Sequence, residues 1–257
     1  MNAFLADSAH LLVRHIRTTI RIPIWIAVTL IQPVIWLTIY GQLFRRVVEI
    51  PGFGSGSYIQ FLTPGVVIMT ALFGSSWSGM GILEDLTDGV MDRMLATPVS
   101  RAALILSRVL HAALTVTVQS FIILLFGLLL GARIAGGAPG FLAILILGSL
   151  LGAGFSALSN GLALITRREE TLIAVVNFFG LPLTFLSTAF MASDLMPGWI
   201  RALSRANPVN WAVNASRDAM LGRDWGNVGV ACLMLAGFTA VSVWVATQAF
   251  RAYRSAS

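Results

Sequence analysis

The sequence contains no lysine, because all 17 of its basic residues are arginines. The phosphate-binding loop of nucleotide hydrolases needs a lysine that reaches the β and γ phosphates, so this chain cannot carry that loop. Schiff-base chemistry by lysine is excluded for the same reason. The single cysteine, Cys232, lies in a hydrophobic run and can form neither an intrachain disulfide nor a thiolate metal site. We expect it to be buried and unreactive.

Charged residues are also scarce, at 11% of a chain that is 57% hydrophobic, whereas soluble domains carry about 25%. The mean hydropathy of +0.84 indicates a membrane protein, and the hydrophobic runs leave no room for a soluble domain. We therefore expect one membrane domain over residues 1–257. The isoelectric point near 10.9 is typical of nucleic-acid binding. The arginines are scattered between hydrophobic runs, however, so no nucleic-acid partner is expected.

Six stretches without Asp, Glu or Arg are long enough to cross a membrane, which takes about 20 apolar residues. They are Ile22–Phe44, Pro51–Leu83, Val109–Ala132, Ile134–Thr166, Thr171–Ser193 and Gly226–Phe250. Six crossings place both termini on one side. If that side is the cytoplasm, it holds ten arginines against seven, a modest bias in the sense of the positive-inside rule. We predict an all-α, multi-pass protein of the plasma membrane with six transmembrane helices and cytoplasmic termini.

The interiors of these six stretches lack ionisable acids and arginines. Ion-coupled carriers usually place such residues within the membrane, so their absence argues against a secondary transporter and favours an apolar or amphiphilic substrate. The three histidines have no metal-ligand spacing. We predict neither a metal site nor an enzyme.

Small residues recur every four positions in the fourth stretch, at Gly148, Gly152, Ser156 and Asn160. Such a stripe lets helices approach closely in lipid. Packing within the bundle is the default interpretation, and packing between subunits is the alternative.

The segment 1–22 precedes the first span and has the pattern of an interfacial helix. His10, Arg14, Arg17 and Arg21 share one helical face, and the apolar residues between them offer area for a membrane surface. Simple anchoring of the topology is the alternative.

Carboxylates concentrate in the loop 84–100, between the second and third spans. Glu84, Asp85, Asp88 and Asp92 are spaced to form one acidic face on a helix. Pro98 is expected to end that helix. Like charges at this spacing repel each other, and anionic lipid repels them too. A basic protein partner would reverse this penalty, whereas a solvated loop helix needs no partner.

The loop resembles a known family. EDLTDGVMDR followed by MLATPVSR is similar to the first cytoplasmic loop of type-two ABC exporter permeases, particularly those related to daunorubicin-resistance membrane subunits. QPVIWLTIYGQLF resembles the first helix of that family, and SDLMPGWIRALSRANPVNWAVNASRDAM resembles the stretch before its last helix. Order and spacing agree across nearly the whole chain. Gln32 stands where family members often carry a basic residue.

The resemblance implies a half-transporter that pairs with a second permease subunit, identical or paralogous, and with two copies of an ABC ATPase subunit. ATP and Mg would bind to that ATPase and no cofactor to this chain, in agreement with the missing lysine. The loop would be a coupling helix seated in a groove of the ATPase. Its candidate residues are Glu84, Asp85, Asp88, Asp92, Arg93, Pro98 and Arg101.

The resemblance also implies short re-entrant helices in 193–227 that close the pathway on the outer side. An ordinary amphipathic loop is the alternative. Pro197 is expected to start one short helix, and Asn207–Pro208 to separate it from a second that runs to about Leu221. Candidate outer-gate residues are Asn207, Pro208 and Arg217. We expect Arg217 to cap a helix or to pair with Asp218 or Asp194.

In this family the second and fifth spans face the dimer axis. Candidate pathway residues are therefore Trp77, Asn177, Phe178, Phe179 and Phe185, for each of which a lipid or core contact is the alternative. The expected cargo is a drug, a lipid-like molecule or another amphiphile. Export of polysaccharide and ATP-independent transport by a carrier or channel are the alternative functions.

Overall fold

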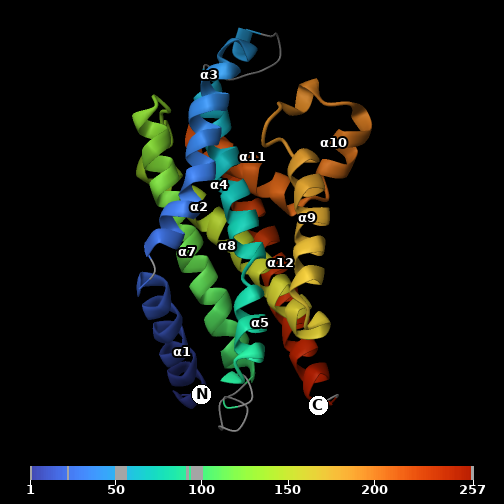
Figure 1. The fold of residues 1–257 in the computed structure, drawn as a ribbon. Helices are drawn as coiled ribbons and strands as arrows, with labels where there is room; N and C mark the ends of the chain where they lie inside the picture. The colour runs from blue at the N-terminus through green and yellow to red at the C-terminus, as the bar shows by residue number, and fades with distance from the viewer. Residues whose placement is uncertain (1, 22, 50–56, 91–92, 94–100, 256–257) are drawn as a thin grey trace.

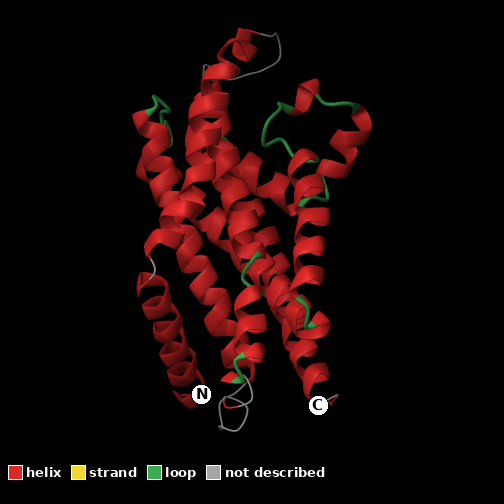
Figure 2. Cartoon of the chain, viewed as in Figure 1, coloured by secondary structure: helices red, strands yellow, loops and turns green. Residues whose placement is uncertain are grey.

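The computed structural model describes residues 2–21, 23–49, 57–90, 93 and 101–255. Every regular element in these ranges is a helix, as Figure 2 shows, so the all-α prediction is confirmed for the described part of the chain. The elements are α1 (Asn2–Arg21), α2 (Pro23–Ile35), η1 (Trp36–Tyr40), α3 (Gly41–Leu43), η2 (Arg45–Glu49), α4 (Tyr58–Ser76), α5 (Met80–Thr87), α7 (Arg101–Leu129), α8 (Gly137–Thr166), α9 (Glu169–Phe185), η3 (Ser193–Leu195), α10 (Gly198–Ser204), α11 (Pro208–Leu221) and α12 (Trp225–Ser255).

Four helices in the described ranges are long and apolar enough to cross a membrane. They are Tyr58–Thr87, Ala103–Leu129, Gly137–Thr166 and Trp225–Arg251. The first predicted span corresponds to a shorter apolar helix, Val28–Leu43, and the fifth to α9, which has 17 residues. The fifth stretch is charge-free to Ser193, but its last residues form turns instead of helix. Four predicted spans are thus helices of spanning length, and six crossings stay a prediction.

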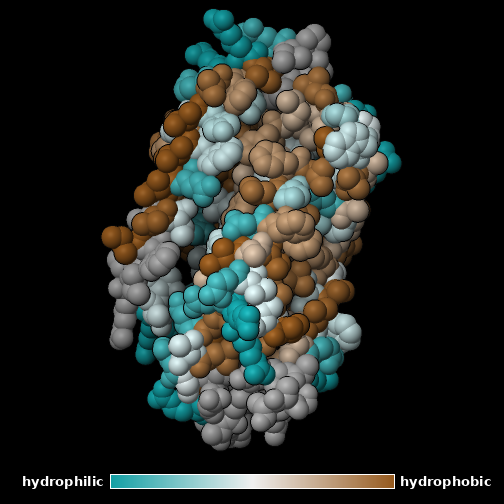
Figure 3. All heavy atoms as spheres, turned by 45° about the vertical axis from the view of Figure 1, so that its right-hand side comes forward, coloured by the Kyte–Doolittle hydropathy of each residue, from teal (hydrophilic) through white to brown (hydrophobic). Residues whose placement is uncertain are grey.

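The helices run side by side along one long axis (Figure 1). Both termini lie at the lower end in that view, here called the terminal end, together with the end of α5, the start of α7 and the α8–α9 connection. The opposite end carries η2, the α7–α8 turn and α10. On the face shown in Figure 3, apolar side chains dominate the middle, and hydrophilic ones gather mainly toward the two ends. This distribution suits a protein that exposes its middle to lipid.

Helix α8 is the centre of the bundle, since it packs against α4, α7, α11 and α12. A Cβ built at Gly152 would lie 2.9 Å from a methyl carbon of Val116 on α7. On the same stripe, Ser156 and Asn160 donate hydrogen bonds to the Ser78 hydroxyl, at 2.9 and 3.1 Å. Close packing of small residues replaces the hydrophobic force that lipid does not supply. The predicted packing of this stripe within the bundle is confirmed.

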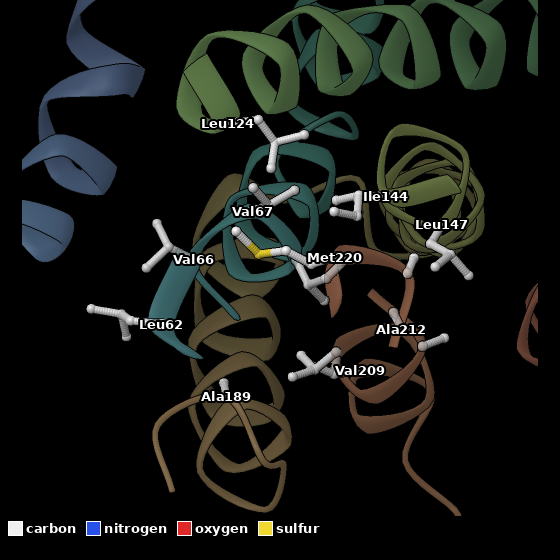
Figure 4. Packing of buried hydrophobic residues seen from close by; sticks show 14 of the residues in the cluster. Leu62, Val66, Val67, Leu124, Ile144, Leu147, Ala189, Val209, Ala212 and Met220 are labelled. Atoms are coloured by element: carbon white, nitrogen blue, oxygen red, sulfur yellow. The ribbon is translucent and has the colours of Figure 1, made fainter. Parts of the chain in front are cut away.

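The larger apolar core lies toward the opposite end, where α4, α7, α8 and α11 meet. Figure 4 shows side chains from these helices converging, with Val67 of α4 and Met220 of α11 close to each other. Leu62, Val67 and Val209 are fully buried. The core therefore includes α11, which fixes this short helix to the long ones.

The second span is interrupted, because a turn at Trp77–Gly79 separates α4 from α5. The Gly79 amide donates to the Ser159 hydroxyl of α8 at 3.0 Å, and a Cβ on Gly79 would lie 2.5 Å from the Ser159 carbonyl oxygen. Only glycine allows the backbone at position 79 to come this close to Ser159. The contact with α8 therefore fixes the position of the break.

The predicted acidic helix over the loop 84–100 is wrong in its first half. Helix α5 ends at Thr87, and Gly89 follows with φ +65°, a left-handed conformation that terminates helices. Glu84 and Asp85 therefore lie on the last turn of the second span, and Asp88 caps it. The predicted helix end at Pro98 lies outside the described residues.

Helix α1 has nearly the bounds predicted for the interfacial helix and packs against α7. Its His10, Arg14 and Arg17 side chains are exposed, as a shared polar face requires, and the Arg21 side chain lies outside the description. In Figure 1 the helix stands beside the terminal half of α7.

Candidate functional site

The segment between α9 and α12 folds as two short helices, as predicted. Pro197 is the N-cap of α10, and Asn207 is the N-cap of α11 with Pro208 in its first turn. The Asn207 side chain accepts a hydrogen bond from the Val209 amide at 2.9 Å. Its Nδ2 donates to the carbonyl oxygens of Leu183 and Leu186, at 2.7 and 3.1 Å. Asn207 thus caps the start of α11 and the end of α9 together.

The next polar residues on the same face of α11 bind the chain that follows α9. Asn210 Oδ1 accepts from the Thr188 amide at 3.0 Å and from its hydroxyl at 2.9 Å. The Thr188 hydroxyl also lies 2.6 Å from Asn214 Oδ1. Asn210 is buried, and Asn214 is half-buried. Sequence reasoning did not select Asn210, Asn214 or Thr188 as site residues.

Arg217 completes this face and is the most deeply buried cation of the segment. Its guanidinium donates to the carbonyl oxygens of Phe61 (3.2 Å), Thr188 and Ala189 (3.2 Å). The group also lies over the Phe61 ring, with Cζ 3.6 Å from the ring centroid. An arginine guanidinium stays charged in proteins, so these contacts stabilise a buried cation.

The expected pairing of Arg217 with Asp218 or Asp194 is wrong. Asp218 accepts a hydrogen bond from the Asn227 side chain at 2.6 Å, and Asp194 lies by α10, where its carbonyl oxygen accepts from Arg201. Arg217 points to the opposite side of α11, toward α4 and the end of α9. The Asn207, Asn210, Asn214 and Arg217 side chains form what we call the outer seal, which joins α11 to α4 and α9.

The candidate coupling residues divide into exposed and engaged groups. Glu84 and Asp88 are exposed at the terminal end. Arg93 is exposed as well, and it donates to the carbonyl oxygens of Asp88 and Gly89 at 3.1 and 3.2 Å. Asp92, Pro98 and the Arg101 side chain lie outside the description, although α7 begins at Arg101. The structure therefore leaves two carboxylates of the stretch facing outward.

Asp85 differs, because it is paired within the chain. Its carboxylate accepts a hydrogen bond from Arg108 of α7, and Arg14 of α1 lies 3.5 Å away. The Asp85 and Arg108 side chains are only 15% and 11% exposed, against 44% for Arg14. Arg108 also donates to the Gly81 carbonyl oxygen at 3.1 Å. Asp85 thus links α5 to α7 and α1 through ion pairs within the chain.

Two histidines adjoin this ion pair. The rings of His15 and His111 lie 5.7 Å apart, and His111 Nε2 lies 2.8 Å from the Thr19 hydroxyl of α1. Burial, together with the positive charges of Arg108 and its neighbours, lowers the pKa of His15 to about 3. His15 is therefore neutral at physiological pH, and we call Arg14, His15, Asp85, Arg108 and His111 the inner cluster.

The candidate pathway residues do not meet in one site within the chain. Trp77 lies at the α4–α5 break and lines a cavity with α2 and α7, whereas Phe179 lines a different one with α8 and α12. Phe178 is 72% exposed and meets the Phe179 ring edge-on, with centroids 5.1 Å apart. Phe185 is exposed near Phe190. The exposed Asn177 donates only to the Ile173 carbonyl oxygen of its own helix among the described contacts.

Within the described ranges, no three His, Cys, Asp or Glu side chains are grouped so that they could hold a metal ion. Cys232 is half-buried in α12, so it is less buried than expected.

The comparisons with known proteins agree with the resemblance. The family described as ABC-2 type transporter matches residues 9–221. The transport permease ycf38 of Cyanophora paradoxa is 31% identical over 80% of this chain and 71% of its own length. The daunorubicin resistance ABC transporter permease protein DrrB1 of Streptomyces coeruleorubidus is 28% identical over 89% of this chain and 80% of its own. The doxorubicin resistance permease DrrC of Mycobacterium tuberculosis H37Rv is 24% identical over 75% and 69%. The chain belongs to the ABC-2 type transporter family.

Proposed function

We propose that this protein is the membrane subunit of an ATP-driven exporter that moves a drug, a lipid-like molecule or another amphiphile out of the cytoplasm. The observation that carries the proposal is the family match over residues 9–221, with relatives whose names specify anthracycline resistance. The absence of lysine supports it independently, since the chain cannot form a phosphate-binding loop. A separate ATPase subunit, in two copies, binds ATP and Mg and supplies the energy.

The terminal end of the bundle is the surface that meets the ATPase. Glu84, Asp88 and Arg93 are exposed there, so their charges are available to a partner. Asp85 lies one residue away but fixes α5 to α7 and α1. A force applied to the exposed residues would therefore reach α1 and α7 as well as the second span. In this arrangement both termini are cytoplasmic and the chain is a multi-pass protein of the plasma membrane.

The outer seal closes the pathway on the other side of the membrane. Asn207 and Arg217 donate to backbone carbonyl oxygens, and Asn210 and Asn214 accept from Thr188. A re-entrant segment needs such partners where lipid cannot satisfy its polar groups. The exposed rings of Phe178 and Phe185 on α9 are contact area for a second permease subunit, identical or paralogous, with the pathway between the two.

The first test is co-purification of the full-length chain with the ATPase encoded beside it. We expect a stable complex whose ATPase activity rises with an anthracycline. The double variant Glu84→Arg/Asp88→Arg should abolish this stimulation, because it reverses the exposed charge without touching Asp85.

The matched control is Asp194→Arg, which makes the same change at an exposed carboxylate of the opposite end. It should leave complex and stimulation intact. If ATPase activity were stimulated equally in wild type and in the double variant, Glu84 and Asp88 would not be coupling residues. A chain that binds no ATPase and transports alone on an ion gradient would instead be a secondary carrier.

A further inference from the structure

A cavity of about 130 Å³ lies between α2, η1, α4 and α7. Its walls include the Trp36 and Trp77 rings and the side chains of Met69, Gln32 and Gln119. None of the lining residues, all in the described part of the chain, carries a formal charge. The cavity is lined by residues of the first, second and third helical passes and by none of α9.

Gln119 of α7 has an acceptor without a partner in this cavity. The residue is only 3% exposed, and its Nε2 donates to the Thr29 hydroxyl at 2.9 Å. Its Oε1 receives no hydrogen bond from the described residues. A buried carbonyl oxygen in this state is unfavourable, and a ligand donor would relieve it.

The oxygen faces the space that Gly74 leaves open. A Cβ built on Gly74 would lie 3.2 Å from Gln119 Oε1, and Gly74 itself is exposed. Gly74 lines the same cavity, and a side chain at this position would crowd the acceptor from that side.

The aromatic wall is held in place by its neighbours. The Trp36 ring stacks on Tyr40 with centroids 4.4 Å apart, and Phe190 lies 5.0 Å away on the same measure. Trp77 faces the cavity from the α4–α5 break. Indole faces attract both flat apolar rings and cations.

We propose that this cavity binds one end of an amphiphile, an alkylamine that carries an aromatic ring. Its N–H donates to Gln119 Oε1 while its ring lies against Trp36 and Trp77. The volume is below the range of about 300–1,000 Å³ typical of drug-sized sites, so the rest of a larger molecule extends outward past Gly74. The inference rests on the proposed function in one respect: the proposed function makes the bound amine the exported molecule.

The test compares two naphthalene cations, 1-naphthylmethylamine and (1-naphthylmethyl)trimethylammonium. They share the ring and the positive charge, but the first has N–H donors where the second has three N-methyl groups. Equilibrium dialysis measures their binding to the full-length chain in detergent, with empty micelles subtracted. We expect the amine to bind about tenfold more tightly or better, since a hydrogen bond from a charged donor is worth at least that much.

The variant Gln119→Leu keeps the volume and removes the acceptor. It should weaken the amine about tenfold, leave the trimethylammonium probe unchanged and so bring the ratio near one. The matched control Gln248→Leu, on α12 away from the cavity, should keep the wild-type ratio. Gly74→Val should weaken both probes, because it fills the cavity from α4.

Equal affinities in wild type, or an unchanged ratio in Gln119→Leu, would overturn the inference. If Gln119→Leu does not give a monodisperse protein, Gly74→Val decides, and unchanged binding of both probes would reject the site. The assay contains neither ATPase nor ATP, so a failure of ATP-driven transport leaves its result intact. If the chain exported its cargo but bound the two probes equally, the proposed site would be wrong and the proposed function would stand.

Discussion

Arg217 and Arg108 are buried toward opposite ends of the bundle, and they are neutralised in different ways. Arg217 of the outer seal is held by three backbone carbonyl oxygens and an aromatic ring. Arg108 of the inner cluster is held by the carboxylate of Asp85 and one carbonyl oxygen. Arg217 therefore contacts carbonyl dipoles and an aromatic ring, whereas Arg108 contacts the full negative charge of Asp85, which Arg14 of α1 also approaches.

The two arginines therefore differ in what must move to release them: mainly backbone around Arg217, and mainly a side chain around Arg108. Backbone carbonyl oxygens cannot leave Arg217 unless α9 and α4 move, so the outer seal is part of the fold. Asp85 instead lies within ion-pair distance of two side chains, the buried Arg108 and the exposed Arg14.

The largest effect is expected for Arg217→Leu. The change leaves the carbonyl oxygens of Phe61, Thr188 and Ala189 without their donor, and each buried unpaired group costs about 1–3 kcal/mol. Unfolding in mixed micelles should show a loss of about 3–5 kcal/mol, summed with the lost ring contact. The control Arg223→Leu, at an exposed position, should change stability by less than about 0.5 kcal/mol.

Asp85→Asn is expected to come second. It removes the carboxylate and leaves the Arg108 guanidinium buried without a counter-charge, at a cost of about 3 kcal/mol. The same neutralisation at the exposed Glu84, by Glu84→Gln, should cost almost nothing. The same unfolding assay compares the two variants. Equal losses of unfolding free energy would show that the ion pairs of Asp85 do not stabilise the packing of α5 on α7 and α1.

Asn207→Ala should cost about 2 kcal/mol, combining the lost cap of α11 with the lost bonds to two α9 carbonyl oxygens. Asn177→Ala is the matched change, because its amide binds only its own helix among the described contacts. That variant should unfold like wild type. If the two asparagines proved equivalent, the joining role of Asn207 would be lost.

The smallest effect is expected for Gly89→Ala, which places a Cβ in the left-handed region at φ +65° and should cost about 1 kcal/mol. Gly89→Asn should cost less, since asparagine tolerates this conformation. Gly229→Ala, within α12 and with no atom within 4 Å of its Cβ, should stabilise slightly. Thermal unfolding orders the three variants, and a stabilising Gly89→Ala would contradict the helix end at Thr87.

The sequence predicted the helical class, the small-residue stripe of α8 and both helices before α12, because each has a local signal such as a proline, an N-cap or a fixed spacing. It did not predict the division of the acidic stretch. Spacing alone places Glu84, Asp85 and Asp88 on one face, but Gly89 ends the helix and Arg108 captures Asp85 from another helix.

The polar face of α11 could have been found in part. Asn207, Asn210, Asn214 and Arg217 recur at three, four and three residues, the spacing of one helical face. Its partners could not, since most are backbone groups of α4, of the end of α9 and of the turn after it, which the sequence does not distinguish. The unpaired oxygen of Gln119 could not be predicted either, because its surroundings include Gly74, which lies on a different helix.

ATP-driven uptake of daunorubicin into vesicles that contain the chain and its ATPase tests the central claim most directly. We predict uptake that requires both ATP and the ATPase, that is abolished by Glu84→Arg/Asp88→Arg and that survives Asp194→Arg. Uptake by vesicles containing the chain alone, or undiminished uptake in the charge-reversed variant, would contradict the account.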